Sequence, residues 1–456
     1  MRKKSIIVVL LFVFLAITLI SIFYNKPKEE KKEDQKIEFN KLDAMVIKKE
    51  NGNITVQNSN NIIYTFGMDD DDIKIGDIEE FEYDGNLDEN KDLQDIQIKN
   101  YKKLEDYKDK NGILKVWLDN GIFKDYYKKA YEKLNDMTLD EKIAQILLVR
   151  YPDENQSEVL KQYQFGGYIF YAKDFKDKTY AEVQNMMSSL QEVSKIPILT
   201  AVDEEGGKVV RVSSNPNLAK EPFKSSRELY LEGGFDKIKE DTINKSKLLY
   251  DLGINLNLAP VVDVSTDPND YMYSRALGEN SDITSTYAKT VIEASHGLGV
   301  SYVLKHFPGY GNNVDTHEGT SIDERSYEDI LNNDLPPFKA GIEAGAENVL
   351  VSHNTVSSID TNNPASLSPS IHNLLRGKLG FTGIIITDDL AMGATKDIED
   401  ATVTAILAGN DLIITTDYED SMNSVKEAID NNIIDESLID KLAFRVIAFK
   451  YYKKLM

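Results

Sequence analysis

Residues 305–319, KHFPGYGNNVDTHEG, gather side chains suited to acid–base chemistry into one short glycine-rich segment. The segment holds two of the five histidines in the chain. Asp315 and His317 are two positions apart, and in an extended loop such residues lie on the same side. A carboxylate beside an imidazole favours the protonated ring and fixes its orientation. The pair therefore predicts a histidine that acts as a general acid near neutral pH.

A second chemical segment is GIIITDDLAMGAT, in which two aspartates follow an apolar run. Successive strand residues face opposite sides, so only one of Asp388 and Asp389 is expected to reach a site. A buried carboxylate there can act as a nucleophile or a base. The sequence has no cysteine, no H-E-x-x-H spacing and no G-x-S-x-G turn. A carboxylate and an imidazole remain, and together they suit transfer of a sugar to water with no metal or other cofactor.

Two further segments offer groups that could bind a substrate. AVDEEGGKVVRV places Asp203 at the end of an apolar run, before two glycines that allow a close approach of the backbone. STDPNDYMYSRALGEN is a long loop with Arg275, whose guanidinium can donate two hydrogen bonds to an acid or to sugar hydroxyls. An arginine on the surface is the alternative for Arg275.

These groups need elements that bring them together, and the chain from residue 137 to residue 456 supplies a repeating pattern of short apolar runs and longer amphipathic segments. Such runs indicate parallel strands buried on both faces, with helices between them. The pattern predicts an α/β fold, a TIM-type (β/α)8 barrel, and a doubly wound sheet is the alternative. The runs end at the following polar residues, which a barrel would bring to one face: Asp203, Asp263, Lys305, His306, His353, Asp388 and Asp389.

The N-terminal region differs from the rest. Basic residues precede an uninterrupted apolar run at 5–24, and twenty helical residues span roughly 30 Å, the thickness of a bilayer core. We expect a single-pass anchor at 1–25 with the bulk of the chain on the extracytoplasmic side, and a cleaved signal peptide is the alternative. A charged linker at 26–38, a small β-rich domain of unknown role at 39–100 and a helical connector at 101–136 are expected to follow.

The composition sets bounds on the partners. The chain has 456 residues and a formal net charge of −23. Such an acidic protein would repel phosphate, so nucleic acid is not expected as a partner. A hydrophobic fraction of 41% is normal for a globular protein, so the chain is expected to fold.

The segments AVDEEGGKVVR, KHFPGYGNNVDTH, LPPFKAGIEAG and ITDDLAMGA together resemble the signature segments of glycoside hydrolase family 3. They are most similar to its single-barrel bacterial β-N-acetylglucosaminidases. The resemblance runs from about Met137 to the C-terminus. It implies a retaining hydrolase of terminal β-linked N-acetylglucosamine, on peptidoglycan fragments or related oligosaccharides.

By position, the resemblance implies that Asp388 is the nucleophile and His317 the acid/base, oriented by Asp315. It also implies that a further set of residues binds the hydroxyls of the terminal sugar: Asp203, Arg211, Arg275, Lys305 and His306.

One position departs from the family pattern, because the usual G-H-G is Gly309-Tyr310-Gly311 in this chain. Other activities remain open. They are a β-N-acetylglucosaminide phosphorylase, a β-glucosidase, which is less expected because no second α/β domain follows, and a wall-sugar-binding module without activity.

Overall fold

The computed structural model describes residues 39–87, 96–311, 313, 319 and 321–456. The predicted anchor at 1–25, the linker at 26–38, and both Asp315 and His317 lie outside these residues. Within the described part of the chain, no helix combines the length and apolar character needed to cross a membrane.

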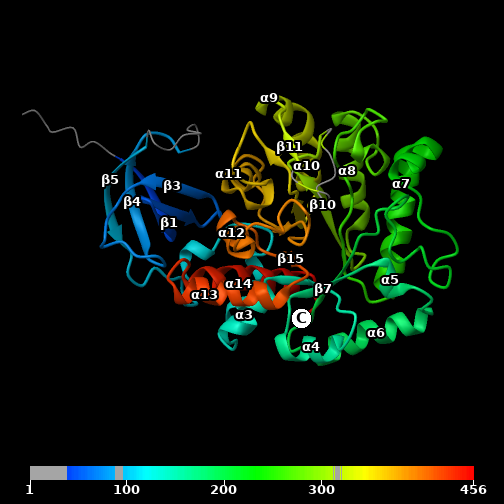
Figure 1. The fold of residues 1–456 in the computed structure, drawn as a ribbon, viewed down its shortest axis with the longest axis horizontal. Helices are drawn as coiled ribbons and strands as arrows, with labels where there is room; N and C mark the ends of the chain where they lie inside the picture. The colour runs from blue at the N-terminus through cyan, green and yellow to red at the C-terminus, as the bar shows by residue number, and fades with distance from the viewer. Residues whose placement is uncertain (1–38, 88–95, 312, 314–318, 320) are drawn as a thin grey trace, which may run out of the picture. The chain divides into compact units, whose positions relative to one another are not determined.

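The predicted α/β barrel is confirmed (Figure 1). Eight strands form one sheet in the order β14-β12-β10-β9-β8-β7-β6-β15, and all the pairings between them are parallel. A parallel bridge between Ile386 and Leu412 brings the two ends of this row together, which makes the sheet a nearly closed barrel. The strands are β6 Leu147–Arg150, β7 Gly167–Phe170, β8 Leu199–Val202, β9 Leu256–Asn257, β10 Ser301–Phe307, β12 Asn348–Val351, β14 Ile384–Thr387 and β15 Ile413–Thr415.

The strands are buried along almost their whole length, and all seven residues of β10 are buried. Burial on both faces explains why these strands read as continuous apolar runs rather than as alternating ones. Helices connect the strands and lie outside the barrel (Figure 1). The helices of this region include α3 Leu139–Gln145, α4 Gln156–Tyr163, α6 Tyr180–Val193, α7 Ser226–Asp251, α8 Ser281–Ser295, α10 Leu335–Glu343, α11 Pro369–Asn373, α12 Ala401–Ala408, α13 Tyr418–Asp430 and α14 Glu436–Tyr452.

Local sequence signals set several of the element ends. Thr138 and Glu141 form a capping box at the start of α3, because each side chain accepts a hydrogen bond from the backbone N–H of the other residue. In the N-terminal sheet, Asn51 and Gly52 have φ angles of 51° and 74° and make the tight turn between two strands.

Five strands precede the barrel and form a separate sheet in the order β3-β2-β1-β4-β5. They are β1 Asn40–Glu50, β2 Asn53–Asn58, β3 Ile63–Gly67, β4 Ile78–Asp84 and β5 Gln97–Lys103. One side of this sheet has its own apolar cluster around Val46, Phe66 and Phe81. Other residues of the sheet, including Met45 and Ile63, belong to the same continuous core as the barrel.

The segment between the sheet and the barrel includes the short helix α2 (Tyr127–Leu134) and is fixed to α14 by a buried charge network. Arg445 of α14 lies 2.9 Å from Asp119 of this segment and 2.6 Å from Asp411. Arg376 lies 2.6 Å from the other oxygen of Asp411. All of these side chains are at most 2% exposed, so each buried charge has a partner of opposite sign.

Candidate active site

Ionisable side chains meet at one rim of the barrel, where the carboxyl ends of the strands lie. Asp203 directly follows β8, and Asp388 directly follows β14. Lys305 and His306 are in the last part of β10, and Arg275 lies in the loop after β9. The structure thus brings together residues that are far apart in the sequence.

Lys305 is at the centre of this group. Its ammonium nitrogen lies 2.7 Å from Asp203 Oδ1 and 2.8 Å from Glu205 Oε1, and its side chain is 3% exposed. Burial alone would lower the pKa of Lys305, but Asp203 and Glu205 hold the pKa above its ordinary value. Lys305 therefore stays a cation at neutral pH and donates hydrogen bonds.

Arg275 is bound by the same glutamate. Its Nη2 lies 2.6 Å from Glu205 Oε1 and its Nε lies 3.0 Å from Glu205 Oε2, which is the paired geometry that a guanidinium makes with a carboxylate. Burial works to raise the pKa of Glu205, but the charges of Lys305 and Arg275 outweigh it and hold the pKa well below its ordinary value. Glu205 is therefore a carboxylate that orients two cations.

His306 lies between Arg275 and a buried aspartate. Its Nδ1 is 2.8 Å from Asp263 Oδ2, and its Nε2 is 3.3 Å from Arg275 Nη2. A guanidinium can only donate, so Nε2 must accept and Nδ1 must carry the proton that Asp263 binds. The contacts therefore define a neutral imidazole of one tautomer.

Tyr310, the position that departs from the family pattern, helps to hold this histidine. Its backbone N–H donates to Asp263 Oδ1 at 2.7 Å, and its ring packs edge-on to His306 with 5.7 Å between the centroids. The tyrosine is 3% exposed and packs with Val261 and Met272. In this chain the position therefore belongs to the packing beneath His306.

Asp388 lies at the rim with its backbone N–H bonded to Val351 O at 3.0 Å. Burial works to raise its pKa, but the electrostatic influence of His353 and His306 outweighs burial and holds the pKa below its ordinary value. Asp389 differs, because burial raises its pKa and its Oδ1 accepts from the Ala391 N–H at 3.0 Å. Asp388 is thus ionised at neutral pH, whereas Asp389 supports the turn after β14.

Arg211 is held near the site by the loop that follows β8. Its guanidinium lies 3.9 Å from Asp203 Oδ2 and over the ring of Tyr171, 5.6 Å from the centroid. Glu204 fixes this loop, because its buried carboxylate accepts from the backbone N–H groups of Arg211 and Val212 at 2.8 and 2.7 Å. Its own N–H donates to Asn257 Oδ1 at 2.9 Å, which ties the loop to β9.

The structure places all five predicted binding residues at this rim: Asp203, Arg211, Arg275, Lys305 and His306. Sequence reasoning missed Glu205, although the i, i+2 spacing that joins it to Asp203 was a usable signal, since both contact Lys305. Among the described residues, no cluster of histidine and acidic side chains has an arrangement that could hold a metal ion.

The model of the glycosyl hydrolase family 3 N-terminal domain matches residues 138–449, which cover the whole barrel. The chain belongs to glycosyl hydrolase family 3. It is therefore a glycoside hydrolase, and the ionisable side chains described above lie at the end of the barrel where (β/α)8 enzymes carry their active sites.

The chain is also similar to individual named proteins. A beta-hexosaminidase of Xylella fastidiosa is 31% identical over 237 residues, which are 51% of this chain and 69% of that protein. A family 3 beta-N-acetylglucosaminidase from a Paenibacillus species has a TM-score of 0.65 and 26% identity, over 70% of this chain and 63% of the other. The Mycobacterium tuberculosis protein LpqI has a TM-score of 0.64 and 27% identity, over 70% of this chain and 95% of the other.

Proposed function

We propose that the protein is a retaining exo-β-N-acetylglucosaminidase that removes terminal β-linked N-acetylglucosamine from peptidoglycan fragments or related oligosaccharides. The observation that supports this most is the buried network of Asp203, Glu205, Arg275, Lys305 and His306 beside the ionised Asp388. These side chains offer donors and acceptors for the hydroxyls of a single sugar ring. The names of the relatives support the acetylated sugar.

In this proposal the reaction has two steps. Asp388 attacks the anomeric carbon while the bond to the leaving oxygen breaks and His317 donates a proton to that oxygen. Water then gives a proton to His317, attacks the same carbon and releases Asp388. Two inversions at that carbon leave the configuration retained. Asp315 would orient His317 and favour its protonated form.

Burial supports an exo-acting enzyme. The side chains of Lys305 and Glu205 are only 3% and 4% exposed, so they close the inner end of the site. A ring bound to them would have its non-reducing end against protein, and only the leaving side would reach solvent. Such a site would release one sugar at a time from a chain end.

The apolar run at 5–24 and the basic residues before it support a membrane-anchored enzyme with its barrel on the extracytoplasmic side. Wall fragments or environmental oligosaccharides would be its substrates there. Membrane fractionation of cells that express the full chain, with protease added from outside, tests this. Protection of the barrel from the protease would contradict it.

The test of activity uses protein that lacks residues 1–36 and a nitrophenyl β-N-acetylglucosaminide. Asp388→Asn should lower kcat by at least about 10³-fold, because it removes the nucleophile. Asp389→Asn is the matched control, since its amide oxygen can still accept from Ala391, and it should retain most activity. His317→Ala should stay active mainly on activated leaving groups, which need no acid. Equal turnover by wild type, Asp388→Asn and His317→Ala would overturn the proposal, and sugar 1-phosphate formed on addition of phosphate would indicate a phosphorylase.

A further inference from the structure

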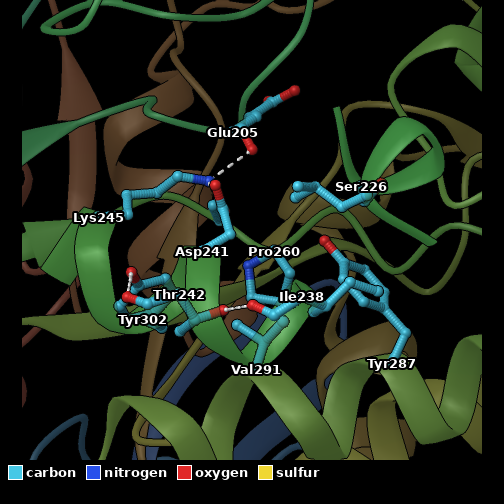
Figure 2. Close-up of a pocket in the computed structure, with 12 residues that line it drawn as sticks. Glu205, Ser226, Ile238, Asp241, Thr242, Lys245, Pro260, Tyr287, Val291 and Tyr302 are labelled. Carbon is cyan, nitrogen blue, oxygen red and sulfur yellow. Dashed lines mark hydrogen bonds and ion pairs between the residues drawn. The ribbon is translucent and has the colours of Figure 1, made fainter. Parts of the chain in front are cut away.

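A buried ion pair on α7 lies next to Glu205 of the site (Figure 2). Lys245 and Asp241 are one turn apart on α7, with 3.1 Å between Nζ and Oδ2. Their side chains are 8% and 12% exposed, and Lys245 lies over the ring of Phe223, 5.1 Å from the centroid. Burying two charges is unfavourable unless further hydrogen bonds offset the loss of hydration, so a buried pair at this position is expected to have another partner.

The contact that explains the pair is with the site itself. Figure 2 shows Lys245 reaching from α7 to Glu205, whose backbone carbonyl accepts from Nζ at 3.0 Å. The backbone N–H of Glu205 donates to Val209 O at 3.0 Å. Both backbone groups of Glu205 are therefore fixed, and Lys245 supplies one of the two attachments.

The position of Glu205 determines the position of two cations. Its carboxylate binds Arg275 through both oxygens and Lys305 through one. A shift of the Glu205 backbone would move both cations together. The ammonium of Lys245 is thus connected through one residue to the groups that would hold the sugar.

A small cavity borders Glu205, Asp241 and Lys245. Its volume is about 20 Å³, enough for about one water molecule, and its polar lining includes Asp241, Thr242 and Tyr287. The cavity borders Lys245, so a slightly larger cation such as a guanidinium could be accommodated at this position.

We infer that Lys245, held by Asp241, is a positioning residue: it fixes Glu205 from behind and so aligns Arg275 and Lys305 for the terminal sugar. The inference rests on the proposed function, because it concerns the same sugar site. Lys245 touches no substrate and acts only through Glu205. The charged group of Lys245 contacts Asp241 and the backbone of Glu205, so its loss should change the alignment of the site more than the barrel.

The test measures kcat and KM on the nitrophenyl substrate, the Ki of free N-acetylglucosamine and the unfolding temperature. Lys245→Met should raise KM and Ki by about tenfold and change kcat by less than about threefold, since it weakens binding of ground state and transition state alike. Lys245→Arg should restore most of the affinity, because it keeps a charged donor. Lys247→Met, an exposed lysine on the same helix, is the control and should match wild type.

A second variant removes both charges at once, so that no unpaired carboxylate stays buried. Asp241→Asn with Lys245→Met should show the same rise in KM and Ki even if Lys245→Met alone does not fold. A Ki within about twofold of wild type in this double variant overturns the inference, as does a loss that Lys245→Arg does not restore. No turnover and no binding of N-acetylglucosamine by wild type would instead overturn the proposed function.

Discussion

Lys450 offers a direct test of the energetics of the barrel core. It lies on α14, is fully buried, and donates to Gln145 Oε1 at 2.7 Å. Burial lowers its pKa from 10.5 to about 7. In the unfolded chain the lysine keeps its ordinary pKa, so between pH 7 and 10 the unfolded state binds more protons than the folded state. The free energy of unfolding therefore rises with pH across that window.

The magnitude follows from the difference between 10.5 and about 7. Each pKa unit corresponds to about 1.4 kcal/mol, so the buried amine costs roughly 4–5 kcal/mol at pH 7 and below about 1 kcal/mol at pH 10. Lys450→Met removes this cost but leaves Gln145 Oε1 without its donor, which costs about 1–2 kcal/mol. We expect the variant to be more stable than wild type by about 2–4 kcal/mol at pH 7 and less stable by up to about 1 kcal/mol at pH 10.

Urea unfolding at the two pH values measures this difference. Trp117 is the only tryptophan of the chain and packs against Phe444 of α14 with 5.8 Å between the ring centroids, so its fluorescence reports on this core. Lys454→Met, an exposed lysine near the same end of the chain, controls for the loss of charge. A stability difference between Lys450→Met and wild type that is the same at both pH values would refute the reasoning.

Three further predictions concern other parts of the molecule. Asp119→Asn should lower the free energy of unfolding by about 3 kcal/mol because it leaves Arg445 short of one buried carboxylate, and a loss below about 1 kcal/mol in urea unfolding would contradict this. The acid limb of kcat/KM that reports Asp388 should lie below the ordinary pKa of an aspartate, because the pKa of Asp388 is held below that value and the carboxylate is lost only as pH falls through it. A limb controlled by Asp388 that lies above the ordinary pKa of an aspartate would contradict this. Gly311→Ala should lower both the unfolding temperature and kcat/KM, because φ is +61° and the new Cβ would lie 2.6 Å from Arg325 Cζ, and wild-type values of both would contradict it.

The barrel was predictable from the sequence because its strands read as short apolar runs with amphipathic segments between them, and several of the runs end at polar residues. That pattern also predicted which residues would meet at the rim, and Lys305 and Asp203 do lie in contact. The pairing of His306 with Asp263 was harder to predict, since both end apolar runs but nothing local joins them. Roles for Asp388 and His317 stay predictions that the kinetic variants above test, and the role of Asp315 stays a prediction.

The C-terminal helix shows what local sequence cannot reveal. Basic residues on a helix are usually solvated, yet the structure buries Lys441, Arg445 and Lys450 of α14 completely. Their partners come from distant segments, since Lys441 donates to Gln57 Oε1 at 2.9 Å across 384 positions of the chain. Charge on a helix predicts exposure only when no other element covers it, and the covering elements here are not neighbours in sequence.

The core that the N-terminal sheet shares with the barrel has a consequence for how the chain is divided. The family match begins at residue 138, and a fragment cut there would be an obvious choice for expression. Such a fragment would lose Met45 and Ile63 from its core. It would also lose Asp119, which pairs with Arg445, and Gln57, which accepts a hydrogen bond from Lys441. We therefore expect the unit that unfolds cooperatively to begin with the first strand of the sheet and not at the boundary of the family match.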